Sequence, residues 1–486
     1  MKERIKAKAL IAALLVAVMI PLSIIPSSAT APSQPTELFG SYTFDTSLSG
    51  GHALIMENRE ITFDLSDFPN HNDENWMDSY TASVKTEYTL FNPTEQEIVL
   101  QIAFPVGNPP QYYYGTQANP DLAKYSVMIN GEKINLELRH VYDTEYNIND
   151  PDGFAGSIKD EYISNEFCSP KMTVTKYTFV QSDVKNSYAY VGFDVNKNEL
   201  SGSIISFGDS YVHDQPYGVK RIHTVAGENG STYELYVFGN DLKELPEFNF
   251  YMDAGIEDGE EISGKMEYIG KETMTFSELV SSYYDESRGI SELDWYNMAA
   301  AEMSYLIERG SLANSLSSLK NGFSYYMVKG FIYEIILSPG ERVVNTVIAP
   351  LYPSIETKYE PATYSYSYIL SQGNADMNYN DINVSIITPY YMLDGEGFEK
   401  TDNGYRATYK AKTVHSENLT SINGGFYFTL CESESPEEVT DYSSLGMLFI
   451  IIALILMPIL LLRELFISIS NGINNIKQWF NGIIRK

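Results

Sequence analysis

One acidic segment of the chain alternates oxygen-bearing side chains in a way that suits calcium. Carboxylate and amide groups occupy every second position and two aspartates follow, namely Asp143, Glu145, Asn147, Asn149, Asp150 and Asp152. Oxygen ligands at such spacing can hold Ca²⁺, but the sixth position lacks the glycine that turns an EF-hand loop. We therefore favour a solvated loop, keep a calcium site as the alternative, and assign no metal ligand and no cofactor.

The histidines and the common catalytic motifs also fail to define a site. The histidines never approach metal-ligand spacing, and they are His52, His71, His140, His213, His223 and His415. The sequence has no GxSxG, HExxH, P-loop or glycine-rich dinucleotide motif. Acidic pairs such as Asp253 and Glu257 are plentiful, but paired carboxylates act together only at defined separations. We predict no catalytic residue and a protein that is not an enzyme, with a metal-dependent surface hydrolase as an alternative.

Cysteines and tyrosines leave two further questions open. Cys168 and Cys431 could pair in an oxidising compartment, although sequence does not give their separation. Tyr364, Tyr366 and Tyr368 line one face of a predicted strand. They could form a sugar-stacking platform, but tyrosine fills sheets so often that ordinary packing is the preferred interpretation.

These groups belong to a chain that we expect to be anchored in a membrane at its C-terminus. Residues 445–462 carry no charge, and residues 442–462 match the thickness of a hydrocarbon core as one transmembrane helix. Acidic residues precede the span, whereas Arg463, Lys477, Arg485 and Lys486 follow it. Since basic residues mark the cytoplasmic side, the N-terminal portion is predicted to lie outside the cell.

The two ends support this topology. Residues 1–29 combine a basic start, an apolar run and small residues before Ala29, as in a signal peptide; an uncleaved anchor is the alternative. In the tail, 463–486, apolar residues recur every three or four positions, namely Leu465, Ile469, Ile473, Ile476, Phe480 and Ile483. This stripe predicts a cytoplasmic amphipathic helix lying on the inner leaflet, with docking to a protein partner as the alternative.

The extracellular part is predicted to be mainly β, with two or more antiparallel sandwich-like regions. Tyrosine, threonine and valine recur with period two in short segments separated by turn residues. Ala82–Phe104 reads as a strand pair around Asn92-Pro93, and Asn130-Gly131 predicts a second hairpin. We place an N-terminal β region at 37–270, a C-terminal β-sandwich at 323–432, and a helical connector at 274–310, which begins with a Thr275/Glu278 capping box.

Two resemblances add to these interpretations. Tyr88–Thr94 followed by Phe104-Pro105 resembles the start of the VIT domain of inter-alpha-trypsin inhibitor heavy chains. The order of signal, β-rich ectodomain, Asp294–Asn297 helix, Pro339–Glu341 turn, Thr429–Cys431 and membrane span resembles uncharacterised single-pass surface proteins of Gram-positive bacteria. That resemblance implies architecture and location, and it assigns no active residue.

Charge narrows the expected partners. The chain carries 64 acidic and 33 basic side chains, a net charge of −31, so it repels nucleic acid. We predict a non-enzymatic cell-surface protein that binds an extracellular protein or glycan or serves a structural role. The alternative is a receptor that relays the state of the ectodomain to the cytoplasmic tail.

Overall fold

A computed structural model describes most of residues 38–439 and part of the C-terminal segment. The described residues are 38–39, 43–44, 47–49, 54–69, 76–107, 111–112, 121–142, 151–164, 168–185, 189–196, 203–207, 211–215, 219–252, 261–308, 316–323, 327–370, 378–379, 381–409, 425–439, 463 and 465–477. The chain divides into two compact units, one of residues 36–355 with 364–434, the other of 1–35 with 356–363 and 435–486. In the second unit, β23 (Tyr359–Glu360) pairs with β31 (Glu437–Glu438).

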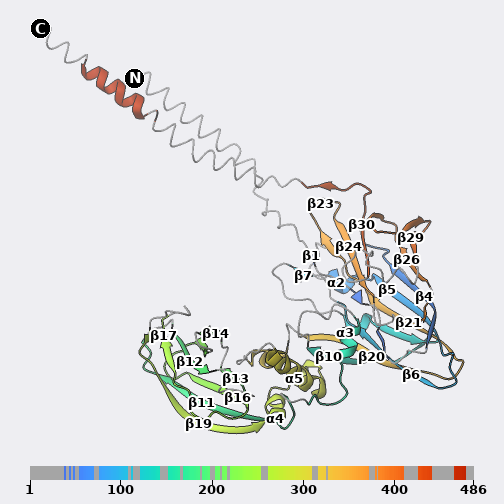
Figure 1. Cartoon of the computed structure of the whole chain (residues 1–486). Helices are drawn as coiled ribbons and strands as arrows, with labels where there is room; N and C mark the ends of the chain where they lie inside the picture. The colour runs from blue at the N-terminus through green and yellow to red at the C-terminus, as the bar shows by residue number, and fades with distance from the viewer. Residues whose placement is uncertain are drawn as a thin grey trace. The chain divides into compact units, whose positions relative to one another are not determined.

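The larger unit contains a sandwich of two broad sheets (Figure 1). Sheet 1 has the order β27 (Tyr391–Asp394), β30 (Gly425–Cys431), β24 (Thr363–Ile369), β22 (Ser354–Glu356), β1 (Leu38–Phe39), β7 (Gln111–Tyr112), with β2 (Thr43–Phe44) beside β24. Sheet 2 has the order β28 (Glu399–Thr401), β29 (Gly404–Tyr409), β26 (Ile382–Ile387), β4 (Ile55–Asp64), β5 (Ser83–Phe91), β21 (Arg342–Pro350), β8 (Ser126–Ile129), β9 (Glu132–Lys133), with β25 (Asn378–Tyr379) beside β4. Phe63 of sheet 2 meets Tyr368 and Phe428 of sheet 1, with ring centroids 5.6 and 5.2 Å away.

Strand pairing in sheet 2 corrects the predicted division of the β regions. β5 pairs with β21, and β4 pairs with β26, although these partners come from the ranges 37–270 and 323–432. The two ranges therefore share one sheet and do not form separate β regions. The β4–β26 pair is also parallel, whereas the sequence predicted antiparallel sheets. Local periodicity identifies a strand, but it does not say which distant strand will be its neighbour.

Sheet 3 combines strands from both halves of the chain. Its order is β10 (Glu137–Tyr142), β20 (Met327–Leu337), β6 (Ile98–Pro105), β3 (Ser47–Ser49). On one face, Phe154 of α3 (Pro151–Ser157) packs on Ala103, Val141 and Ile332. The Asn130-Gly131 hairpin between β8 and β9 is confirmed, with φ of 50° and 84° at its two turn residues.

The predicted strand pair Ala82–Phe104 is wrong. β5 belongs to sheet 2 and β6 to sheet 3, so the chain changes sheets at the Asn92 turn. The chain changes sheets again between β20 and β21, and the two turns are joined: Asn92 N donates to Glu341 O at 3.0 Å, and Gly340 N donates to Asn92 O at 2.9 Å. Alternation cannot distinguish a hairpin from two strands that enter facing sheets.

A second sandwich forms from sheets 4 and 5. Sheet 4 has the order β13 (Ser203–Phe207), β16 (Thr232–Gly239), β11 (Thr173–Ser182), β19 (Lys265–Thr275). Sheet 5 has the order β14 (Tyr211–Gln215), β15 (Val219–Val225), β12 (Tyr190–Asn196), β17 (Asn249–Tyr251), β18 (Glu261–Ile262). Aromatic and aliphatic side chains from both sheets fill the space between them. Phe193 and Phe207, for example, meet edge to face at 5.5 Å. The prediction of a mainly β fold with antiparallel sheets is confirmed in these sheets.

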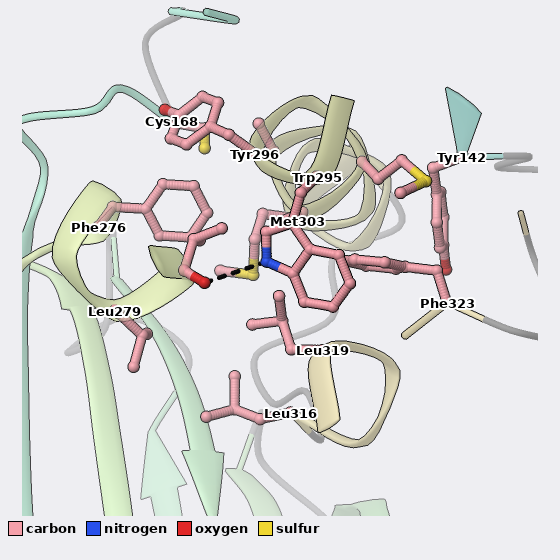
Figure 2. Close-up of a cluster of buried hydrophobic side chains, with 14 of the residues drawn as sticks. Tyr142, Cys168, Phe276, Leu279, Trp295, Tyr296, Met303, Leu316, Leu319 and Phe323 are labelled. Carbon is pink, nitrogen blue, oxygen red and sulfur yellow. Dashed lines mark hydrogen bonds between the residues drawn. The ribbon is translucent and has the colours of Figure 1, made fainter. Parts of the chain in front are cut away.

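Helices follow β19, where the sequence placed the connector. They are α4 (Phe276–Ser282), η3 (Glu286–Arg288), α5 (Glu292–Glu308) and α6 (Ser317–Asn321); α2 (Trp76–Ser79) and η1 (Leu122–Lys124) lie elsewhere. The Thr275/Glu278 capping box is present at the start of α4. α5 carries Trp295, whose Nε1 donates to Val280 O at 3.0 Å (Figure 2). Residues of α4, α5, α6, β10, β11 and β16 share this buried cluster, which we call the connector core.

The membrane predictions fall largely outside this description. The signal segment 1–29 and the span 442–462 lie outside the described residues. Within the described ranges, no helix is both long and apolar enough to cross a bilayer. Residues 465–477 are helical, and Leu465, Phe466, Ile469, Ile473 and Ile476 are each at least half exposed. The first part of the predicted stripe is therefore helical with exposed apolar side chains, whereas Phe480 and Ile483 lie outside the described residues, and the amphipathic helix on the inner leaflet stays a prediction.

Candidate functional site

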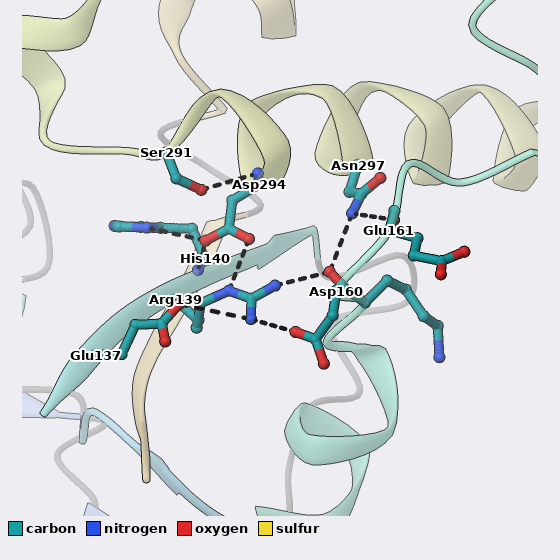
Figure 3. Close-up of polar contacts among 9 residues, drawn as sticks. Glu137, Arg139, His140, Asp160, Glu161, Ser291, Asp294 and Asn297 are labelled. Carbon is teal, nitrogen blue, oxygen red and sulfur yellow. Dashed lines mark hydrogen bonds and ion pairs between the residues drawn. The ribbon is translucent and has the colours of Figure 1, made fainter.

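Titratable side chains converge where α5 meets β10. Asp294, on the first turn of α5, points toward β10, and Arg139 projects from β10 between Asp294 and Asp160 (Figure 3). Arg139 Nε lies 2.9 Å from Asp294 Oδ1, and both side chains are buried, with 5% and 3% exposed. The other carboxylate oxygen accepts the backbone N–H of His140 at 2.9 Å. We call this group the α5–β10 ion pair.

The remaining hydrogen-bond donors of Arg139 are also occupied. Its two terminal nitrogens donate to Asp160 Oδ1 and to Lys159 O, each at 2.7 Å. One turn along α5, Asn297 Nδ2 donates to the carbonyl oxygens of Lys159 and Glu161 at 3.3 and 3.1 Å. Its Oδ1 accepts from Ile163 N at 2.9 Å. Asp294 and Asn297 thus fasten the segment after α3 and strand β10 to one side of α5.

Electrostatics assign the ion pair a structural role. Burial alone would raise the pKa of Asp294, but hydrogen bonding from His140 and Arg139 and the charge of Arg139 outweigh it and hold the pKa below its usual value. A general base works best with a pKa near the operating pH. A carboxylate that is ionised and saturated with donors is instead a fixed anchor. His140 Nδ1, 3.8 Å from Asp294 Oδ2, is too distant for a hydrogen bond.

A second carboxyl group has the opposite environment. Glu302, two turns further along α5 and 7% exposed, faces the connector core. Ser318 Oγ donates to its Oε1 at 2.6 Å, and Tyr142 OH donates to the same oxygen at 3.4 Å. Burial raises the pKa of Glu302 to about 7, against the lowering effect of these two hydroxyls. Sequence offers no signal for this group, because a single acid on a helix is usually solvated.

Most residues of the proposed calcium segment cannot be placed. Asp143, Glu145, Asn147, Asn149 and Asp150 lie outside the described residues, and only the backbone of Asp152, in α3, is described. Across the ranges that the structure does describe, no group of His, Cys, Asp or Glu side chains could hold a metal ion. The calcium alternative therefore stays a prediction.

Of the histidines, two can be located by their side chains. His140 and His223 are buried in β10 and β15, as the packing interpretation of His140 predicted. Of the remaining four, only the backbone of His213, in β14, is described.

The structure shows whether Cys168 and Cys431 form a disulfide. Cys168 lies in the connector core and Cys431 in β30; both are buried thiols, and no disulfide joins them. Burial raises the pKa of Cys168 to about 12, so this thiol stays protonated and unreactive at neutral pH.

The tyrosine ladder on β24 is part of the sandwich core. Tyr364, Tyr366 and Tyr368 are exposed by 5% or less. The hydroxyls of Tyr366 and Tyr368 bond across the sandwich to Tyr80 OH at 2.8 Å and Thr86 Oγ1 at 2.9 Å. Ordinary packing is thus confirmed, and the sugar-stacking interpretation of these three residues is wrong. The alternation of side chains along a strand shows which residues share a face, but it does not show which face is covered by another sheet.

Two other tyrosines occupy the outer face of the same sheet. Tyr391 of β27 is 39% exposed and Tyr427 of β30 is 40% exposed. Tyr391 lies opposite Cys431, which is itself buried but has the same position in the alternation of β30 as Tyr427 and Thr429. Thr429 Oγ1 is 2.9 Å from Ser365 Oγ and 3.3 Å from Tyr427 OH. We call Ser365, Tyr391, Tyr427 and Thr429 the tyrosine face.

Comparison with known proteins adds little to this geometry. No protein-family model and no curated protein matches the chain. A solved structure from Legionella pneumophila, described provisionally as a nutrient binding protein, shares 8% identity with it. The match covers 81% of this chain and 72% of the other, with a TM-score of 0.25. A TM-score this low supports no conclusion about fold or function.

Proposed function

We propose that this chain is a membrane-anchored, non-enzymatic surface protein that binds a neutral polysaccharide through the tyrosine face. The observation that carries the proposal is the presence of partly exposed tyrosine rings and hydroxyl groups on neighbouring strands of one sheet. A sugar ring offers an apolar face of C–H groups and a rim of hydroxyls. Tyrosine rings supply contact area at low entropic cost, and the Ser365–Thr429–Tyr427 hydroxyls supply donors and acceptors.

Spacing and charge favour a neutral chain of sugars. Tyr427 lies four positions before Cys431, the partner of Tyr391, so the two rings stand about 14 Å apart along the strands. A polymer can reach both rings at once, whereas a single sugar cannot. The four side chains of the face carry no charge, and the net charge of −31 disfavours an anionic polymer.

We expect the loss of both rings to weaken polysaccharide binding at least tenfold. Truncating Tyr391 and Tyr427 to alanine removes the stacking surface, and about 1.4 kcal/mol in total corresponds to that factor. Retention of the full-length protein in detergent on insoluble β-glucan, chitin and peptidoglycan would measure it. Tyr268→Ala is the matched control, since Tyr268 is 46% exposed on β19, outside sheets 1 and 2.

Two outcomes would contradict this assignment. One is the absence of retention on any of the three polymers. The other is an equal loss of binding in Tyr268→Ala and in the double variant, which would indicate non-specific adhesion. Capture of a surface protein that depends on Tyr391 and Tyr427 would assign the face to a protein partner instead.

We also propose that the tail helix lies on the inner leaflet. Changing Ile473, Ile476 and Phe480 to serine should release it while the protein stays anchored, because each fully inserted apolar side chain contributes roughly 1.5–3 kcal/mol. A cysteine placed at Asn481 would report the change through its reactivity toward a water-soluble maleimide. Equal reactivity before and after the triple change would mean that the helix does not contact the membrane.

A further inference from the structure

A carboxyl group lies inside the packing that joins several elements of the larger unit. Glu302 of α5 is buried beside the connector core, which draws side chains from β10, β11 and β16 as well as from α4, α5 and α6. Figure 2 shows several of these side chains, among them Tyr142, Trp295 and Leu319. Leu316, Leu319 and Phe323 bring the α6 segment into this core. The Glu302–Ser318 hydrogen bond of 2.6 Å is therefore a polar contact between α5 and a segment that is also held by apolar packing and by a hydrogen bond of 3.4 Å from Arg288 to Lys320 O.

Among the described side chains, none forms an ion pair with Glu302. The charged groups on the elements packed around it lie near other partners or are exposed. Arg139 pairs with Asp294, Lys176 with Glu234 and Arg288 with Asp285, and the imidazole Nδ1 of His140 lies 3.8 Å from Asp294. Glu278 belongs to its capping box, and Glu292 and Lys320 are at the surface. Asp294, the other buried acid of α5, is eight residues away, about 12 Å along the helix axis. An ionised Glu302 would therefore be stabilised by two neutral hydroxyls alone among the described side chains.

We propose that Glu302 is a pH-sensitive latch, which holds α6 against α5 when its carboxyl group is protonated and loosens this contact when it ionises. Burying a carboxylate with two neutral partners is costly, whereas the neutral acid fits the same space at little cost. Acidification around the protein would thus tighten the connector core, and a rise in pH would loosen it. This latch is independent of the tyrosine face, and it offers a physical stimulus for the sensor alternative.

The direction of the effect follows from proton linkage. An exposed glutamate has a pKa of about 4.3, and the pKa of Glu302 in the packed state is raised to about 7. The packed state therefore binds the proton more tightly than an opened state. Its advantage is complete below about pH 4.3 and is lost as the pH rises through 7.

Hydrogen exchange of the α6 amides, measured by mass spectrometry on the full-length protein in detergent, tests the latch. At each pH the exchange rate is divided by that of Glu302→Gln, which cancels the intrinsic pH dependence of exchange. Glutamine resembles the protonated carboxyl group and cannot ionise. We expect the ratio to rise at least tenfold between pH 5 and pH 8, since the pKa difference favours opening by about that factor or more.

Controls separate the latch from general loosening. Glu292→Gln changes an exposed acid on the same helix and should preserve the wild-type pH dependence. Glu302→Met, a second non-ionising variant, should abolish the pH dependence if Glu302→Gln does not fold. A wild-type to Glu302→Gln ratio that stays constant from pH 5 to pH 8 would overturn the proposal, as would unchanged pH dependence in Glu302→Met.

Discussion

Replacing Asp294 with alanine should destabilise the larger unit by about 3–5 kcal/mol, because it leaves the buried charge of Arg139 without its buried partner. It also removes the acceptor of the His140 amide. Urea unfolding followed by tryptophan fluorescence would measure the change, since Trp295 is the next residue on α5 and lies in the connector core. Glu137→Ala is the matched control, because Glu137 is exposed and lies 3.8 Å from Arg139.

A double variant distinguishes an unpaired charge from lost packing. Arg139→Met with Asp294→Leu should recover most of the stability, since an apolar pair leaves no charge to solvate. The contribution of Asp294 should also depend on pH. Its pKa in the folded state is lowered, so the stabilisation is complete above the unfolded value of about 4 and is lost as the pH falls through the folded value. An Asp294→Ala variant as stable as Glu137→Ala would refute the role of the ion pair.

Replacing Asn92 with alanine should cost about 3 kcal/mol of stability. The side chain is fully buried, and its amide donates to the carbonyls of Gln96, Leu337 and Ser338 at 2.8, 2.9 and 3.2 Å. Alanine would leave these acceptors and the N–H of Thr94 without their partner, at about 1–3 kcal/mol for each buried group left unpaired. The effect should appear in the same urea titration and as faster proteolysis near both turns.

A half-buried asparagine provides the comparison. Asn58 of β4 donates to the exposed carboxylate of Glu60 at 3.3 Å, and Asn58→Ala should change stability by less than about 0.5 kcal/mol. Equal stabilities of the two variants would mean that Asn92 does not fasten the turns together. Asn92 belongs to the Asn92-Pro93-Thr94 part of the VIT-like motif. In the structure, its hydrogen bonds hold the turn between β5 and β6 against the turn between β20 and β21. The resemblance to the VIT domain itself stays a prediction.

The positions of the strands could be predicted from the sequence, whereas the residues of the candidate sites could not. Alternation identified β5, β6, β20, β24 and β30 because each strand places apolar residues on one face. The same pattern suggested Tyr364, Tyr366 and Tyr368 as a surface, whereas the exposed rings are Tyr391 and Tyr427. The choice depends on which face of sheet 1 meets sheet 2, and no local pattern encodes this.

The sequence by itself determined the local features of this protein. Thr275 and Glu278 were sufficient to predict the start of α4, and Asn130-Gly131 the β8–β9 turn, because caps and tight turns depend on a few neighbouring residues. Tertiary structure alone decided that β5 and β6 enter different sheets. It also decided that Arg139 meets Asp294, 155 residues away, and that Glu302 is buried. Strand pairing and the solvation of a carboxyl group depend on partners brought close by folding, and so lie beyond any reading of neighbouring residues.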